Sequence, residues 1–280
     1  TLNMIAGDGE SNVVHLNSLD YERWEEDNKE NENWTNNYMP GFNRLKALRK
    51  EKKNSNFKEF QFDVLMANPP FAGDIKDPRL IRRYELGKRI IETIDSESKK
   101  KLTKDKGWHE KVSRDILFIE RNLDMLKDGG RMAIVLPQGR FNNTTDKMIR
   151  NFIAQRCRIL AVVGLHGNTF KPHTGTKTSV LFVQKWDKNL CPIKDNYNIF
   201  FATQRKEGKN NSGDKLYWSN TIGKTTTDPE DALKDKYNHP IVYHDLFATQ
   251  TNNSSFTSTP KGIAEAFQQF AIKEKLSFFV

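Results

Sequence analysis

The chain has 280 residues, with 45 Lys and Arg against 36 Asp and Glu, and a formal net charge of +9. Its apolar runs are strand-sized, far short of the roughly 20 residues that cross a bilayer, and no secretory signal opens the sequence, so we expect a cytoplasmic protein with no membrane partner. The two cysteines lack metal-ligand spacing, which excludes a zinc site or disulfide scaffold, and the positive charge suits a polyanion.

The first half of the chain contains two predicted strands. Asn12–Leu16 is β-rich and opens into a loop at Asn17. Phe62–Ala67 is a continuous apolar run that stops at two prolines, which is typical of a strand buried on both faces of a parallel sheet. Residues 79–114 follow with twelve bases and six acids, which indicates either a solvated, partly helical insertion or a phosphate-contacting surface.

Helices and strands then alternate along the chain. Apolar spacing predicts helices over 115–127, stopped by Gly129-Gly130, and over 145–156, while buried strands are predicted over 131–136 and 159–165. Residues 178–185 alternate as a strand that follows too soon for a crossover helix, so we expect an antiparallel, hairpin-like partner. A closing helix is predicted over 260–273, with Ile263, Phe267 and Phe270 on one face. This order predicts an α/β fold with a mostly parallel, doubly wound sheet.

The tetrapeptide Asn68-Pro69-Pro70-Phe71 directly follows a predicted buried strand, at the sheet edge where ligands bind. An exocyclic amine is a poor nucleophile, and two acceptors aimed at its hydrogens favour the form that attacks. The Asn68 side-chain oxygen and the Pro69 carbonyl are candidates, held by consecutive prolines. Phe71 offers a flat face for a base swung out of the duplex. The alternative is an ordinary turn that ends the strand.

A cytosine C5 mechanism would instead need a thiolate nucleophile in this loop, and the loop contains none. Cys157 falls on a predicted helix and Cys191 in a distal loop, so both are expected to serve packing. The reaction predicted from the loop is therefore direct displacement of a methyl group from a sulfonium donor, without a metal.

Four blocks together resemble the modification subunits of type I restriction enzymes, which are N6-adenine DNA methyltransferases. They are the segment from Leu2 to Leu19, the strand with Asn-Pro-Pro-Phe, Gly129–Pro137, and Phe170–Thr178 with the strand that follows. The similarity runs in order from about residue 2 to 185. It implies a Rossmann-like methyltransferase fold, with a catalytic core over 1–185 and an extension of mixed strands and a closing helix over 186–280.

The resemblance also implies a cofactor and partners. S-adenosylmethionine would donate the methyl group, duplex DNA would be the substrate, and specificity and restriction subunits would complete the complex. The family's glycine-rich donor loop does not occur in this sequence, so we expect a core truncated at its N-terminal side. Asn17 stands where the family usually has an aspartate that contacts the cofactor's adenine, and Phe170, Lys177 and Thr178 are candidate base or DNA contacts.

Two other functions remain open from the residues alone. The tetrapeptide would also serve methylation of another planar amine, such as cytosine N4 or a protein glutamine. The absence of a donor loop favours a third possibility, a non-catalytic scaffold fragment that binds DNA. The basic segment after Phe71 favours nucleic acid over a protein tail.

Overall fold

The computed structural model describes residues 16–24, 26, 43, 45–47, 61–94, 101–252 and 261–278. They belong to two compact units, of which the first comprises Thr1–Leu65 with Pro70–Lys127 and the second comprises Met66–Pro69 with Asp128–Val280. The division between the units therefore falls inside the tetrapeptide, between Pro69 and Pro70.

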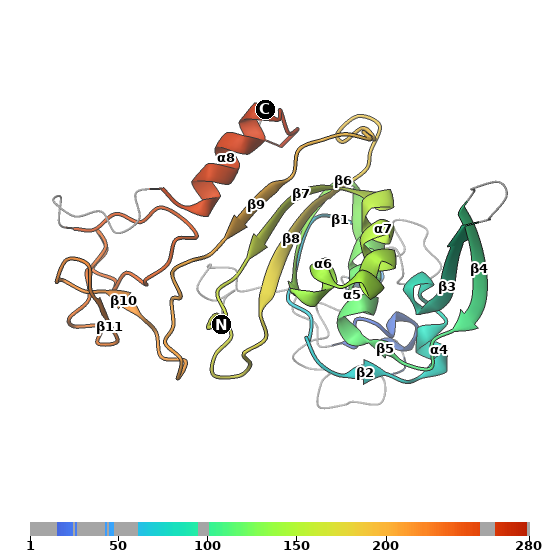
Figure 1. Cartoon of the computed structure of the whole chain (residues 1–280), viewed down its shortest axis with the longest axis horizontal. Coiled ribbons are helices and arrows are strands. Elements are labelled where there is room, and N and C mark those ends of the chain that lie inside the picture. Colours follow the sequence, from blue (N-terminus) through green and yellow to red (C-terminus); the bar gives the residue numbers. More distant parts are fainter. Residues whose placement is uncertain are drawn as a thin grey trace. The chain divides into compact units, whose positions relative to one another are not determined.

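The central sheet has five strands in the order β1-β6-β8-β7-β9, of which β7, β8 and β9 lie wholly within the second unit (Figure 1). Its strands are Phe62–Ala67 (β1), Leu126–Pro137 (β6), Cys157–Gly164 (β7), Thr178–Lys185 (β8) and Phe200–Thr203 (β9). β8 pairs antiparallel with both β6 and β7, whereas β7 and β9 are parallel. β6, β7 and β9 thus run in one direction and β8 runs in the other, which confirms the mostly parallel sheet and the antiparallel partner.

Helices lie on both faces of this sheet. Alternate residues of a strand point to opposite faces, and on β7 Ala161 and Val163 face a cavity that is also lined by helix α8, Ile263–Lys273. Val162 and Gly164 face a second cavity, which is bordered by the short helix α6 (Gly139–Asn142). The 3-10 turn η3 (Thr144–Asp146) and the helix α7 (Lys147–Arg156) follow α6 in the chain. The buried side chains of this unit come mostly from strands and α7: Met132, Ile134, Leu136, Ile149, Phe152, Ile153, Leu160, Leu181 and Val183.

Helix α8 is positioned by aromatic side chains, as its predicted apolar face requires. Phe267 stacks on Phe182 of β8 with ring centroids 6.3 Å apart, and it meets Phe200 of β9 edge-on at 5.6 Å. Phe270 also contacts Phe200, at 5.6 Å. The closing helix and its apolar face are therefore confirmed.

The first unit contains one longer helix, α5 (Arg114–Asp124), and several shorter elements. They are η1 (Tyr21–Arg23), β2 (Asp74–Ile75), α4 (Pro78–Ile81), η2 (Glu85–Gly87), β3 (Lys88–Ile94), β4 (Lys101–Trp108) and β5 (Val112–Ser113). Asp77 caps α4 by accepting a hydrogen bond from the Arg79 amide at 2.9 Å, and Pro78 occupies the first helical position. Leu80, Ile81, Tyr84, Val112 and Leu117 form its core together with Leu19, Tyr21 and Trp24.

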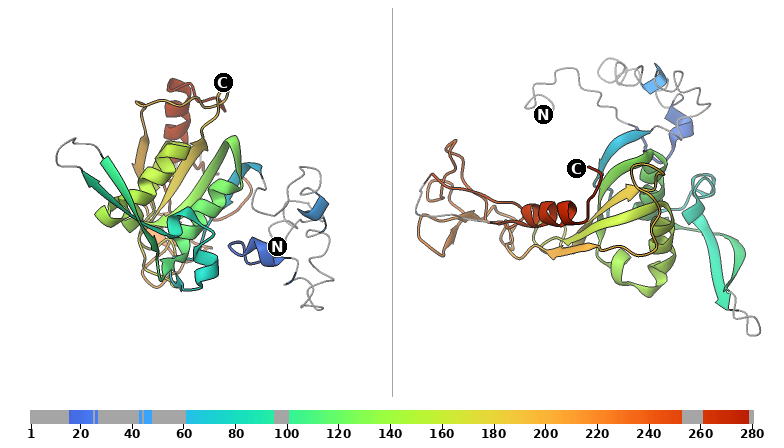
Figure 2. Two further views of the ribbon diagram at one scale, coloured as in Figure 1. Left: turned by 90° about the vertical axis from the view of Figure 1, so that its right-hand side faces the viewer. Right: turned by 90° about the horizontal axis from the view of Figure 1, so that it is seen from above.

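The basic segment after Phe71 contains the short helices α4 and η2 followed by a hairpin, which agrees with the partly helical insertion that was one of its two interpretations. β3 and β4 pair antiparallel from Lys88 opposite Trp108 to Ile94 opposite Lys101, and Figure 2 shows the two strands side by side. Two short helical elements, α4 and the 3-10 helix η2, precede them in this segment. The other interpretation, a phosphate-contacting surface, stays a prediction.

Several predicted boundaries need correction. Gly129-Gly130 does not stop the helix, because α5 ends at Asp124 and β6 already begins at Leu126. Cys157 is the first residue of β7 and does not lie on a helix. The strand expected from Asn12 to Leu16 falls, apart from Leu16, outside the described residues.

β1 was predicted to be buried on both faces, and this is wrong for the described structure. Phe62, Val64 and Met66 are 37%, 53% and 83% exposed. β1 is the last strand on its side of the sheet order, and these three side chains, at alternate positions, point to one face of it.

The remaining chain of the second unit is mostly irregular, with one small ladder between β10 (Tyr217–Trp218) and β11 (Thr225–Thr226). The expected domain boundary at residue 185 falls inside this unit and stays a prediction. No helix in the described part of the chain is long and apolar enough to cross a membrane.

Candidate functional site

Asn17 shapes the turn that follows the first predicted strand. Its side-chain oxygen accepts a hydrogen bond from the Leu19 amide at 3.2 Å. Its backbone carbonyl accepts from the Asp20 amide at 3.0 Å and from the Trp24 indole at 2.8 Å. Such side-chain to backbone bonds are typical of asparagine turns. The Asn17 side chain itself is exposed, so a ligand can reach its amide group.

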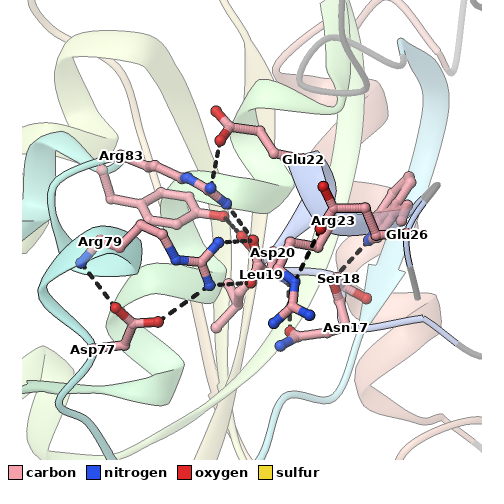
Figure 3. Close-up of polar contacts among 12 residues, drawn as sticks. Asn17, Ser18, Leu19, Asp20, Glu22, Arg23, Glu26, Asp77, Arg79 and Arg83 are labelled. Carbon is pink, nitrogen blue, oxygen red and sulfur yellow. Dashed lines mark hydrogen bonds and ion pairs between the residues drawn. The ribbon is translucent and has the colours of Figure 1, made fainter. Parts of the chain in front are cut away.

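Asp20 anchors this turn to the α4 segment through two arginines (Figure 3). Asp20 is 6% exposed. Arg79 Nη2 lies 2.7 Å from its Oδ2, and Arg83 Nη1 donates to its Oδ1. Arg83 also pairs with Glu22, and Arg79 pairs with Asp77 at 3.2 Å. The hydrogen bond to Asp20 raises the pKa of the Arg79 guanidinium, so Arg79 stays charged at neutral pH.

Two further side chains hold the backbone carbonyls of the same turn. The Tyr84 hydroxyl donates to the Leu19 carbonyl at 2.7 Å, and Arg121 Nε donates to the Ser18 carbonyl at 2.9 Å. Arg121 is fully buried, and its guanidinium lies 4.6 Å from the centre of the Tyr21 ring. Burial lowers the pKa of Arg121 and raises that of Tyr84, which keeps Tyr84 a neutral donor.

The Asn17 turn is therefore fastened by residues that follow Phe71 in the chain. None of these anchoring residues was singled out from the sequence. One signal was present: residues 20–32 are acidic and residues 79–114 are basic, so the two segments have complementary charge. Periodicity and motifs contain no information about which carboxylate meets which guanidinium.

The tetrapeptide is divided between the two units. Pro70 and the half-buried Phe71 begin the second segment of the first unit. Asn68 and Pro69 belong to the second unit, where Asn68 is exposed and Pro69 is buried. Within the part of the chain that the structure describes, no hydrogen bond engages the Asn68 side chain. Its amide oxygen is therefore available to a substrate.

Phe170, Lys177 and Thr178 lie in or next to the loop between β7 and β8. The loop is closed at its base, because the Leu165 amide donates to the Thr178 carbonyl and the Gln138 amide donates to the Lys177 carbonyl, both at 2.9 Å. Phe170 is half-buried, the Lys177 side chain is exposed, and Thr178 is only 2% exposed. Lys177 is thus the surface cation among these candidates.

Gln204, which sequence reasoning missed, ties this loop to the end of β9. It is 5% exposed, and its backbone amide donates to the Gly164 carbonyl at 2.8 Å. Its side-chain oxygen accepts from the His166 amide at 3.1 Å, while its side-chain amide donates to the Lys206 carbonyl at 2.8 Å. One buried glutamine thereby satisfies three backbone groups, those of Gly164, His166 and Lys206.

The chain after Gln204 supports the far side of the same loop. Lys209 Nζ donates to the Lys171 carbonyl at 2.9 Å, and the Asn168 side chain donates to the Lys209 carbonyl at 3.1 Å. Gly213 has a φ of +98°, and a Cβ atom there would lie 2.6 Å from Pro172. The Phe170 loop therefore depends on Gly213, which is distant from it in the sequence. Lys209 and Lys171, which join the same two segments, are 38 positions apart.

Metal-ligating side chains do not gather in the described ranges, where no three His, Cys, Asp or Glu residues come together. Both cysteines are buried, with Cys157 fully so and Cys191 3% exposed. Burial raises the pKa of the Cys157 thiol to about 12, so it is a neutral thiol at physiological pH.

Two curated proteins of Escherichia coli are similar to this chain. The type I restriction enzyme EcoEI methylase subunit is 30% identical over 126 residues, which is 45% of this chain and 21% of that protein. The type II restriction enzyme and methyltransferase RM.Eco57I is 22% identical over 184 residues, 65% of this chain and 16% of that protein. The similarity to each spans about a fifth of that relative's length or less.

A solved structure, the type I restriction-modification system methyltransferase subunit from Streptococcus thermophilus, aligns with a TM-score of 0.36 and 20% identity. The alignment covers 65% of this chain and 29% of that one. The model of the family described as N-6 DNA methylase matches residues 40–228, more than half of the chain. The chain belongs to the N-6 DNA methylase family.

Proposed function

We propose that this chain is the catalytic part of a methyltransferase that transfers a methyl group to N6 of adenine in duplex DNA. The observation that carries the proposal is the exposed Asn68 side chain, free of hydrogen bonds within the described part of the chain, directly after β1 and before a buried proline. Membership of the N-6 DNA methylase family supports it.

In the proposed reaction, the Asn68 side-chain oxygen and the Pro69 carbonyl accept the two hydrogens of the adenine amine. These bonds pull the nitrogen out of conjugation with the ring, so that its lone pair is directed at the methyl group. Pro70 limits the freedom of the Pro69 carbonyl, and fixed acceptors need no reorganisation during the reaction. The amine nitrogen would form the new bond to the methyl carbon while the carbon–sulfur bond of the sulfonium donor breaks, the sulfur would leave as a neutral thioether, and a proton would then leave the nitrogen to solvent.

S-adenosylmethionine, the donor expected from the sequence, would supply an electrophilic methyl group on a sulfonium. Asn17 fits the adenine end of that donor. Its amide oxygen accepts one hydrogen bond, from Leu19, and an amide oxygen has two lone pairs. The second lone pair can accept a hydrogen from an exocyclic amine, and the fastened turn keeps this acceptor in place.

Four residues are proposed to contact the target base or its strand. Phe71 and Phe170 offer aromatic faces to an extrahelical base. Lys177 is exposed and suits a backbone phosphate, whereas the buried Thr178 would act from the base of the loop. All four roles are proposals that rest on residue chemistry and accessibility.

The protein is further proposed to act as the modification subunit of a type I restriction system. The EcoEI relative is a type I methylase subunit. In that arrangement a specificity subunit would select the DNA sequence and a restriction subunit would complete the complex, in the cytoplasm. We also propose that residues 1–185 carry the catalytic core and residues 186–280 extend it.

Nucleoside mass spectrometry tests the reaction directly. DNA treated with the complete, assembled protein and a labelled methyl donor should yield labelled N6-methyl-2′-deoxyadenosine. Label found instead in N4-methylcytosine, or in a glutamine of a protein, would show that one of these alternative substrates is the true one. The absence of label from all three would favour the non-catalytic scaffold.

Asn68→Ala tests the residue that carries the proposal. The single-turnover rate should fall on the order of a hundredfold or more, because one preorganised hydrogen-bonding group is lost. Donor binding and the unfolding midpoint should stay near those of the parent. Asn189→Ala is a matched control, since Asn189 is also an exposed asparagine of the second unit. Near-normal turnover by Asn68→Ala would remove Asn68 from the site.

A further inference from the structure

A cavity of about 660 Å³ lies on the α6 side of the central sheet, entirely within the second unit. Its floor is formed by β7 and β9 and its wall by the segment from the end of β6 to α7. The lining residues on which the argument depends are Gln138, Asn142, Ser179, Val162, Phe201 and Arg205. The volume is ample for one nucleotide.

The cavity lies at the carboxyl ends of the parallel strands. Gln138 directly follows β6, Gly164 is the last residue of β7, and Thr203 is the last residue of β9. Ligands of open parallel sheets bind beyond these ends. No residue proposed above as catalytic lines this cavity, so it is a separate site.

The floor carries an unusually accessible aromatic ring. Phe201 is 71% exposed, and it lies beside the apolar residues Ile159 and Val162 in the cavity lining. A phenyl face open to solvent above an apolar floor suits the stacking of a planar ring. Base-aromatic stacking tolerates every base, because each has a π face.

The charge of the cavity suits an anion. Its described lining includes two guanidinium groups, of Arg150 and Arg205, and no carboxylate. The exposed Arg205 side chain has no hydrogen bond or ion pair within the described residues, while its backbone amide is held by Asp245 at 3.1 Å. The backbone is thus fixed and the guanidinium is left available, in a fork geometry that matches phosphate.

The wall is held rigid before any ligand arrives. Arg150 donates to the carbonyls of Arg140 and Asn143, at 3.1 and 2.7 Å, and Arg140 pairs with Asp146 at 3.2 Å. These contacts fix the segment that carries Gln138 and Asn142, whose amides can both donate and accept at the edge of a base. Preorganised polar groups bind without a large entropic cost.

We propose that this cavity binds one unpaired nucleotide of the DNA substrate. The base stacks on Phe201, its edge meets the Gln138 and Asn142 amides, and its phosphate pairs with Arg205. This inference rests on the proposed DNA methyltransferase function and adds a second nucleotide subsite to it. The mixed polar lining and the guanidinium groups distinguish the cavity from the apolar groove that a partner helix would need.

Photocrosslinking locates the nucleotide. 5-Iododeoxyuridine is placed in turn at each position around the target adenine of a duplex, and the complex with the complete, assembled protein is irradiated. One position should crosslink to the peptide that contains Phe201, and the Phe201→Ala variant should lose that crosslink alone. Crosslinks that map only to other peptides would overturn the proposal.

Binding measurements test the same site by a second route. Phe201→Ala should weaken DNA binding by about tenfold, as loss of one stacked base does. Arg205→Ala should also weaken it and reduce the slope of log K against log salt concentration by about one. Tyr237→Ala and Lys194→Ala are matched controls, because both residues are exposed and neither lines the cavity.

The outcomes separate this inference from the function on which it rests. Unchanged DNA affinity in both variants, with methylation intact, would overturn the subsite and leave the methyltransferase standing. A protein that neither binds nor methylates any DNA would overturn both. Weaker binding in both variants with normal controls, together with the Phe201 crosslink, supports the subsite.

Discussion

Asp20 and Arg83 form an ion pair in which both side chains are largely buried, with exposed fractions of 8% and 11%. The pair connects the turn of Asn17 to the segment after α4. Because Arg79 binds the second oxygen of the same carboxylate, one buried aspartate joins two parts of the chain that both flank proposed functional residues.

Asp20→Asn should therefore lower the free energy of unfolding by about 1.5 to 3 kcal/mol, since it removes a charged hydrogen-bond acceptor and leaves the mostly buried Arg83 with the exposed Glu22 as its counterion. Urea denaturation measures the change, and a double-mutant cycle with Arg83→Met isolates the pair. Asp63→Asn is the control, because Asp63 pairs with Lys127 at an exposed site, with exposed fractions of 80% and 53%, and should cost only about 0 to 1 kcal/mol. Equal effects of the two substitutions would contradict the anchoring role of Asp20.

Tyr84→Phe should lower the free energy of unfolding by about 1 to 3 kcal/mol, because it leaves the buried Leu19 carbonyl without its donor. Tyr237→Phe, at a 67% exposed tyrosine, should have almost no effect. Denaturation of the two variants checks this comparison. Burial raises the pKa of Tyr84, so its hydroxyl should also stay protonated through mildly alkaline pH. The tyrosinate absorbance of Tyr84 is the difference between the ultraviolet titrations of the parent protein and of Tyr84→Phe. This difference should appear only at the alkaline pH at which the protein unfolds.

Gly213→Ala should destabilise the Phe170 loop through two effects. A φ of +98° is strained for alanine, and the new Cβ would lie 2.6 Å from the nitrogen and Cδ of Pro172. Gly223→Ala is a matched control with a φ of +77° and no atom within 4 Å, so it should show backbone strain alone, about 1 to 2 kcal/mol. Gly213→Ala should lower the free energy of unfolding more than Gly223→Ala does, and it should also weaken DNA binding. A cost no greater than that of the control would mean that the loop does not depend on this contact.

Neither cysteine should react in the native protein. Burial raises the pKa of both thiols, that of Cys157 to about 12, so the reactive thiolate is scarce even at mildly alkaline pH. Titration with a disulfide reagent should detect no thiol in the native state and two after unfolding in denaturant. A fast native reaction that also abolished methylation would instead indicate a nucleophilic thiol.

Local patterns were sufficient to predict most regular elements of the second unit. β8 begins at Thr178 and ends at Lys185, as its alternation predicted, and α8 carries the predicted apolar face. These elements follow from side-chain period, which is a property of neighbouring residues. The boundary at Gly129-Gly130 was misassigned because two glycines are read locally as a helix stop. In the structure Gly129 lies within β6, and its carbonyl accepts a hydrogen bond from the buried Gln184 side chain at 3.0 Å.

The proposal for the tetrapeptide at 68–71 comes from the sequence alone, because the chemistry proposed for it depends on adjacent residues. The position of β8 between β6 and β7, the exposure of Met66 and the lining of the 660 Å³ cavity were not recognisable. Each depends on which strand pairs with which, and a strand's own pattern does not specify its neighbours.

The anchoring of the Asn17 turn was decided by tertiary structure alone. Its hydrogen bonds join residues separated by 59 positions for Arg79 and Asp20, 65 for Tyr84 and Leu19, and 103 for Arg121 and Ser18. The sequence determined that acidic and basic segments exist, and hence that they attract. Only the folded chain, by burying Asp20 and Arg121 where an unpaired charge would be costly, selected the partner of each group.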